Sequence, residues 1–247
     1  GHMNKGNLHE LIHRYTENYD TFISAQHDEL FKWRAVQRFR SVWFSDTASS
    51  LPFSRLFDAA RKESAVLIDN SQVMPTCGIV KMAEQRPKEV ETLFRDVLFA
   101  DDGGDIAIRQ THMDQFLDGI EAIRQATFPK SWKYMQDRHA ASCYLSFFSP
   151  EENYIYRYSD AEAFARCTEY GRDIGAGSNF SLTNYYGMCE LIVAALREHD
   201  DLMAKYHAAL DDSCYPDESL HLMAFDLQYC CRCYNLYSGL SFIGRRD

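Results

Sequence analysis

The chain has 247 residues, of which 46% are hydrophobic and 14% aromatic, a composition that excludes a disordered protein and predicts an apolar core. A formal net charge of −10 excludes a protein that coats nucleic acid non-specifically, although a small basic patch is compatible with it. No apolar run approaches the roughly 18 residues needed to cross a bilayer, and no charged-then-apolar leader is present. We therefore expect a soluble, cytoplasmic protein without a membrane partner.

The chain is expected to form a single module over residues 4–240, because no internal repeat or low-complexity linker divides it. Gly1-His2-Met3 is typical of the remnant of a removed affinity tag and is excluded from the fold. Residues 241–247 are expected to begin a linker to a further domain.

Apolar side chains at helical spacing predict most of the secondary structure. The first of these helices carries Leu8, Leu11 and Tyr15, and Pro87 suits the first turn of another. The predicted helices, in chain order, are one before residue 22, one from about 28 to 44, and others near 53–64, 76–84, 87–98, 105–127, 160–168, 181–198, 200–210 and 217–237.

The period changes to two near residue 140. Cys143, Leu145 and Phe147 alternate with their neighbours, and Tyr154 and Tyr156 do the same after the turn SPEEN. This alternation predicts an antiparallel hairpin over residues 141–158, so the expected fold class is α+β, predominantly helical. Tyr154, Tyr156 and Tyr158 would share one face of a strand, either as part of the core or as a half-open stacking surface.

The segment FKWRAVQRFR carries Lys32, Arg34, Arg38 and Arg40 and no acidic residue. Two interpretations are open: a solvated helix face, or a set of phosphate contacts on an otherwise acidic domain.

No catalytic motif is present, and the acid–histidine pairs have no nucleophile at a diagnostic spacing, so we expect no enzyme activity from this chain. Cys230, Cys231 and Cys233, with Cys214 and His221, resemble a metal site only weakly. A helix presents such close thiols poorly to a tetrahedral ion, so buried thiols are expected instead, with no metal and no cofactor.

Five segments in the same order resemble the N-terminal region that precedes the AAA+ motor in one group of McrB-like proteins, the NTPase subunits of modification-dependent restriction systems. They are ELFKWRAVQRF (29–39), IVKMAEQRPKEVETLFRDVLF (79–99), DRHAASCYLSFFSPEENYIYRYS (137–159), NYYGMCELI (184–192) and CYPDESLHLMAFDLQYC (214–230). The resemblance spans nearly the whole chain.

The resemblance implies a target-recognition domain in anti-phage defence. In such proteins the AAA+ motor hydrolyses GTP or ATP and assembles the ring of subunits, and an McrC-like nuclease cuts the DNA. This chain has no Walker motif, so the motor and its nucleotide would lie outside it, in the same parent chain, and the nuclease would be reached through that motor.

Two functions follow as hypotheses. The first is recognition of DNA that carries a modified base, with DNA contacts from Lys32, Arg34, Arg38, Arg40 and Arg138, and with the base stacked on Trp33, Trp132, Tyr154, Tyr156 or Tyr158. The second is a protein-interaction or sensor module that recognises a phage or host protein or regulates motor assembly. The net charge favours the second, and the domain's place in the parent architecture favours the first.

Overall fold

The computed structural model describes residues 2–240, which form an all-helical structure with no β-strand among them. The α-helices of this part are α1 (Lys5–Phe22), α2 (Phe31–Trp43), α3 (Phe53–Ala60), α4 (Ala65–Ile68), α5 (Pro75–Gln85), α6 (Pro87–Thr92), α7 (Ile106–Thr127), α8 (Arg138–Phe148), α9 (Tyr158–Cys167), α10 (Leu182–Leu196), α11 (Asp200–Ala209) and α12 (His221–Cys233). Short 3₁₀ turns η1 (Ala48–Ser50), η3 (Trp132–Tyr134) and η4 (Gly177–Asn179) and a π-helical segment η2 (Leu93–Leu98) complete it.

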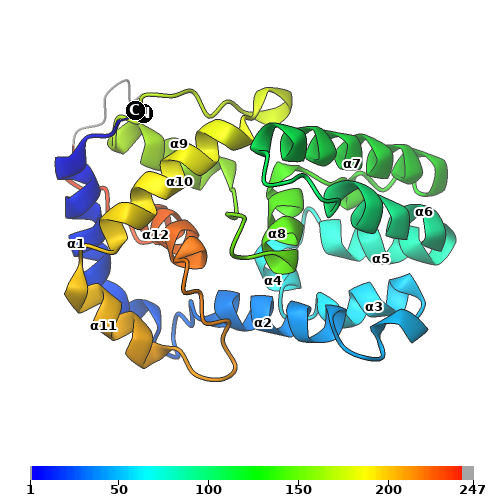
Figure 1. Cartoon of the computed structure of the whole chain (residues 1–247), viewed down its shortest axis with the longest axis horizontal. Helices are drawn as coiled ribbons and strands as arrows, with labels where there is room; N and C mark the ends of the chain where they lie inside the picture. The colour runs from blue at the N-terminus through cyan, green and yellow to red at the C-terminus, as the bar shows by residue number, and fades with distance from the viewer. Residues whose placement is uncertain (1, 241–247) are drawn as a thin grey trace.

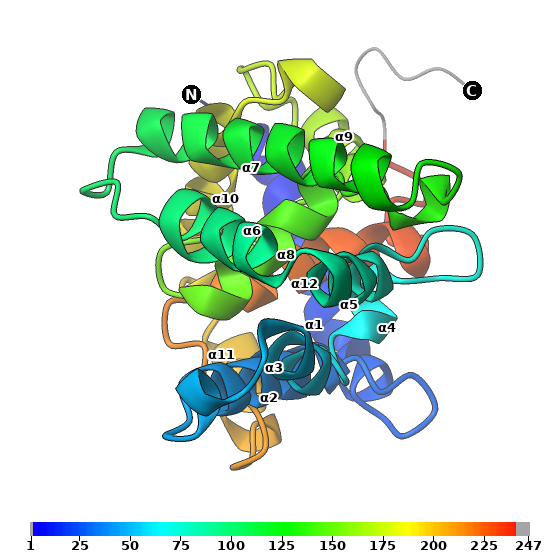
Figure 2. The ribbon, with the colours of Figure 1, turned by 90° about the vertical axis from the view of Figure 1, so that its right-hand side faces the viewer.

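The helices form two groups that share one continuous core (Figure 1). In the first group α12 packs against α1, α9 and α10, and in the second α3 packs against α2 and α5 while α7 packs against η2. Figure 2 shows the second group in layers, with α7 above α6 and α5, and with α3 and α2 below them. Helix α8 contacts α2, α4 and α7 and lies between the groups.

The predicted hairpin is wrong, and with it the predicted α+β fold class. Residues 138–148 form helix α8, in which every side chain from Ala140 to Phe147 is buried. Its sequence keeps a helical period, with Ser142 and Ser146 one turn apart, but over so short an apolar segment the alternation of Cys143, Leu145 and Phe147 fits a strand as well. The helix begins where the Asp137 carboxylate accepts a hydrogen bond from the Ala140 N–H, and Arg40 donates to the carbonyls of Phe147 and Phe148 at its end.

The second half of the predicted hairpin is an extended segment that has no partner strand. Side chains satisfy its backbone instead: His139 donates to the Tyr156 carbonyl, Tyr185 donates to the Ile155 carbonyl, and the Ser142 hydroxyl accepts from the Tyr156 N–H. Buried backbone polar groups require such partners wherever a second strand is missing. Tyr154 and Tyr156 are thereby held between helices.

The predicted helices outside residues 141–158 are confirmed, with ends that differ by a few residues. The predictions missed α4 as well as α8.

His2 and Met3, which the sequence suggested to be a tag remnant, pack on the protein: the His2 carbonyl accepts from the Gly171 N–H at 3.1 Å, and Met3 is buried. The predicted linker at 241–247 lies outside the described residues. No helix within residues 2–240 has both the length and the apolarity to span a membrane.

Candidate functional site

The basic segment of α2 is turned largely inward. Lys32 is 2% exposed, and its ammonium group donates to Glu29 at 2.5 Å and to Asp226 at 2.7 Å. Arg34 is half-buried and pairs with Asp28 at 2.6 Å. Neither side chain is an unpaired cation available to a phosphate.

The other predicted DNA contacts, Arg38, Arg40 and Arg138, lie in different surroundings. Arg40 is half-buried at the end of α8, where its guanidinium lies 4.9 Å from the Phe44 ring centroid. Arg138 contacts Asp114 at 3.4 Å, and of the four cations predicted on α2 Arg38 alone is classed as exposed. The structure does not bring these residues together into one basic patch.

The predicted stacking residues divide into three groups. Trp33 is fully buried, with its indole N–H donating to the Tyr206 hydroxyl at 2.5 Å, and Tyr154 is buried against the His221 ring at 3.8 Å between centroids. Trp132 is 61% exposed on η3 and does not line the cavity that contains Tyr156 and Tyr158. Tyr156 and Tyr158 lie together in one cavity.

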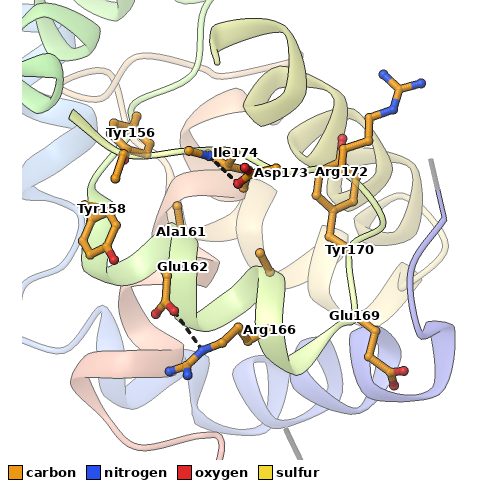
Figure 3. A pocket seen from close by; sticks show the side chains of 13 residues that line it. Tyr156, Tyr158, Ala161, Glu162, Arg166, Glu169, Tyr170, Arg172, Asp173 and Ile174 are labelled. Carbon is orange, nitrogen blue, oxygen red and sulfur yellow. Dashed lines mark hydrogen bonds and ion pairs between the residues drawn. The ribbon is translucent and has the colours of Figure 1, made fainter. Parts of the chain in front are cut away.

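This cavity, of about 580 Å³, lies between α9 and the segment that follows it, residues 169–176 (Figure 3). Such a volume is within the range of small-molecule sites. One face of α9 forms its wall at the helical spacing i, i+3, i+4, i+7 and i+8. The lining residues of that face are Tyr158, Ala161, Glu162, Ala165 and Arg166.

One end of the cavity is aromatic. The Tyr156 ring is fixed by Phe180, at 4.0 Å between centroids, and by Tyr185 at 5.1 Å. Only 4% of Tyr156 is exposed, yet its hydroxyl has no hydrogen-bond partner within residues 2–240. Burial, with the neighbouring Tyr158, raises the pKa of Tyr156 to about 12, so its hydroxyl is a neutral donor. Tyr158 is 52% exposed and completes this end.

The middle of the cavity is polar. Glu162 and Arg166 form an ion pair at 2.9 Å, one helical turn apart on α9. Across from them, one oxygen of the Asp173 carboxylate accepts from the Gly175 N–H at 2.9 Å, and no bond within the described part occupies the other. Figure 3 shows these three side chains between the tyrosine end and Tyr170.

The outer end is formed by Tyr170 and Arg172. The Tyr170 hydroxyl donates to the Asn184 carbonyl at 2.8 Å, which fixes the ring. Arg172 is exposed, forms no ion pair with residues 2–240, and extends away from α9 in Figure 3. Glu169 lies beside them with its carboxylate bonded to the Asn4 amide at 2.5 Å.

Gly175 shapes the far wall. Its φ of +72° is a left-handed conformation, and a Cβ at this position would lie 2.1 Å from the Asn179 carbonyl oxygen. Only glycine fits such a close approach. The turn brings Asp173 and Ile174 over the face of α9.

Sequence reasoning named two residues of this cavity, Tyr156 and Tyr158, and missed the others. The signal was present in YSDAEAFARC, where Ala161 and Ala165 place small side chains one turn apart between Tyr158 and Arg166. It was missed because the tyrosines were assigned to a strand, which separates them from the helix that follows.

The cysteines do not form a metal-binding cluster within residues 2–240: no group of three His, Cys, Asp or Glu side chains there is arranged so that it could hold an ion. Cys230 and Cys231 are buried, and burial raises both thiol pKa values, whereas Cys233 is exposed.

Comparison of the chain with protein-family models, with curated proteins and with solved structures finds no match in any of the three. The likeness to McrB-like N-terminal domains therefore stays a prediction from the quoted segments.

Proposed function

We propose that this chain is the N-terminal target-recognition domain of an McrB-like restriction NTPase, and that it binds DNA by holding a modified base in the cavity beside α9. The observation that carries the proposal is the cavity of about 580 Å³ beside α9, which is large enough for a ligand and has Tyr156 and Tyr158 at one end. The Tyr156 hydroxyl has no hydrogen-bond partner within the described residues and can donate to a ligand.

In this proposal, stacking on an aromatic side chain of the cavity supplies the affinity for the base. Extruding a base from a duplex costs a few kcal/mol, and stacking on an aromatic side chain returns about 1–3 kcal/mol per base. Tyr158 is exposed and offers its ring for stacking, and Tyr156, which is almost fully buried and fixed by Phe180, closes this end of the cavity.

In this proposal, a phosphate contact comes from an arginine of the cavity in place of those on α2. Arg172 is exposed at the outer end of the cavity and forms no ion pair with residues 2–240. Its guanidinium group can approach a phosphate on an otherwise acidic protein, and binding is then expected to depend on salt. The motor and an McrC-like nuclease would act downstream of this binding.

The test is binding of the protein to short duplexes that carry unmodified, methylated, hydroxymethylated or glucosylated bases, at two salt concentrations. Modification-dependent, salt-sensitive binding that is lost in Tyr158→Ala and retained in Trp132→Ala supports the proposal, because both substitutions remove an exposed aromatic side chain. Absence of binding to every duplex at low salt overturns it.

A second candidate function is a protein-interaction or sensor module. Phe44 is 54% exposed and lies 5.7 Å from Phe148 between ring centroids, and Phe148 stacks on Phe99 at 4.2 Å. Exposed aromatic side chains on a protein with a net charge of −10 are compatible with a basic protein partner. Loss of partner capture from infected cells in Phe44→Ala, with Tyr158→Ala unaffected, would favour this function.

A further inference from the structure

Resting on the proposed function, we infer that the modification held in the cavity is a neutral, hydroxyl-rich substituent of about the size of a hexose, and not a methyl group. A glucosylated hydroxymethyl base has this chemistry. The inference depends on the size of the cavity, on the order of its aromatic and polar parts, and on the balance of its charges.

The cavity is larger than a flat base requires. Its volume of about 580 Å³ lies within the range of roughly 300–1,000 Å³ of sites that hold whole small molecules. A base stacked on Tyr158 fills the aromatic end and leaves the length of the α9 wall beyond it open (Figure 3). Ala161 and Ala165 keep that length free, because their side chains end at Cβ.

The part beyond the aromatic end is polar. Glu162, Arg166 and Asp173 lie there, and one oxygen of Asp173 has no partner among the described residues. A methyl group makes no hydrogen bonds, so it would desolvate these groups without compensation. Hydroxyl groups both donate and accept, and they can satisfy a carboxylate and a guanidinium in the same site.

The charges argue against an anionic substituent. Three carboxylates (Glu162, Glu169 and Asp173) and two guanidinium groups (Arg166 and Arg172) line the described part of the cavity. A phosphate placed there would face more carboxylates than cations. A polyhydroxyl group carries no charge and avoids this repulsion.

The test uses matched duplexes that differ in one base: cytosine, 5-methylcytosine, 5-hydroxymethylcytosine and its glucosylated form. The expected result is binding at least roughly 10-fold tighter to the glucosylated duplex than to the hydroxymethylated one, as several added hydrogen bonds would give. Asp173→Asn, which removes a charge and keeps the shape, is expected to lose most of that difference.

The outcomes separate the inference from the proposed function. Equal or tighter binding to the methylated or hydroxymethylated duplex overturns the inference and leaves DNA recognition in place. Methyl β-glucoside is included as a competitor: binding of the free sugar, with no binding to any duplex, keeps a sugar as the ligand of the cavity but overturns its source in DNA, and with it the proposed function. No binding to any duplex or to the sugar overturns both.

Discussion

The ammonium group of Lys32 lies 2.7 Å from the carboxylate of Asp226, and both side chains are almost fully buried. Asp226 also accepts a hydrogen bond from the Tyr15 hydroxyl at 2.6 Å, so the pair joins α1, α2 and α12. Burial opposes the charge on Lys32, but the Asp226 and Glu29 carboxylates outweigh it and raise the Lys32 pKa. A residue that the sequence predicts as a DNA contact is part of the core.

Lys32→Met is predicted to destabilise the fold by about 3–5 kcal/mol, because it leaves Asp226 and Glu29 as buried carboxylates without their cation. Urea denaturation measures the free energy of unfolding. Arg38→Met is the matched control on the exposed side of α2, with an expected change within about 0.5 kcal/mol. Equal effects of the two substitutions would contradict the assignment of Lys32 to the core.

Gly175→Ala is predicted to cost more stability than Gly177→Ala. Both glycines have positive φ, so each substitution carries about 1–2 kcal/mol of backbone strain. A Cβ on Gly175 would in addition lie 2.1 Å from the Asn179 carbonyl oxygen, whereas no atom lies within 4 Å of a Cβ on Gly177. Thermal unfolding measures the difference, and a larger effect at Gly177 would show that the close approach at Gly175 is not a constraint.

Asp217 is predicted to make stability depend on pH. The carboxylate is fully buried and accepts hydrogen bonds from the Tyr206 hydroxyl and from the N–H groups of Leu222 and Met223. Burial nevertheless raises its pKa to about 7. The folded protein then holds this proton more tightly than the unfolded chain, whose aspartate pKa is about 3.9. The stabilisation of the fold by the protonated Asp217 side chain is therefore complete below a pH of about 4 and is lost as the pH rises through 7.

Urea denaturation of the unmodified protein and of Asp217→Asn, at pH 5 and at pH 8, isolates this contribution from those of other groups. The unmodified protein is expected to lose more stability between the two pH values than the variant does. The same pH dependence in both proteins would mean that Asp217 does not titrate in this range.

How far the sequence predicts the fold depends on the environment of each helix. Helix α1 has one buried and one exposed face, so its apolar residues recur with a period that can be read. Helix α8 also keeps a helical period, but it is short and buried, and the tyrosines after it alternate because an extended segment lies between helices. Periodicity alone does not distinguish a helix from a strand in a short apolar segment.

The site was predictable only in part for a related reason. A helical wheel places Lys32 and Arg34 relative to the apolar stripe, but it cannot show that Asp226, nearly two hundred residues away, lies opposite Lys32. Tyr156 and Tyr158 were recognisable as unusual because a buried tyrosine needs a partner for its hydroxyl. The residues 169–176 that complete the cavity carry no pattern that ties them to α9.

The most direct test of the central claim fills the cavity. Ala165 lines the α9 wall and is only partly buried, so Ala165→Phe is expected to fold with an unchanged thermal midpoint while it occupies the space beyond the base that is meant for its modification. Affinity for the best-bound modified duplex is predicted to fall at least about 10-fold in this variant and to be unchanged in Trp132→Ala. Undiminished binding by a folded Ala165→Phe protein would contradict recognition through this cavity.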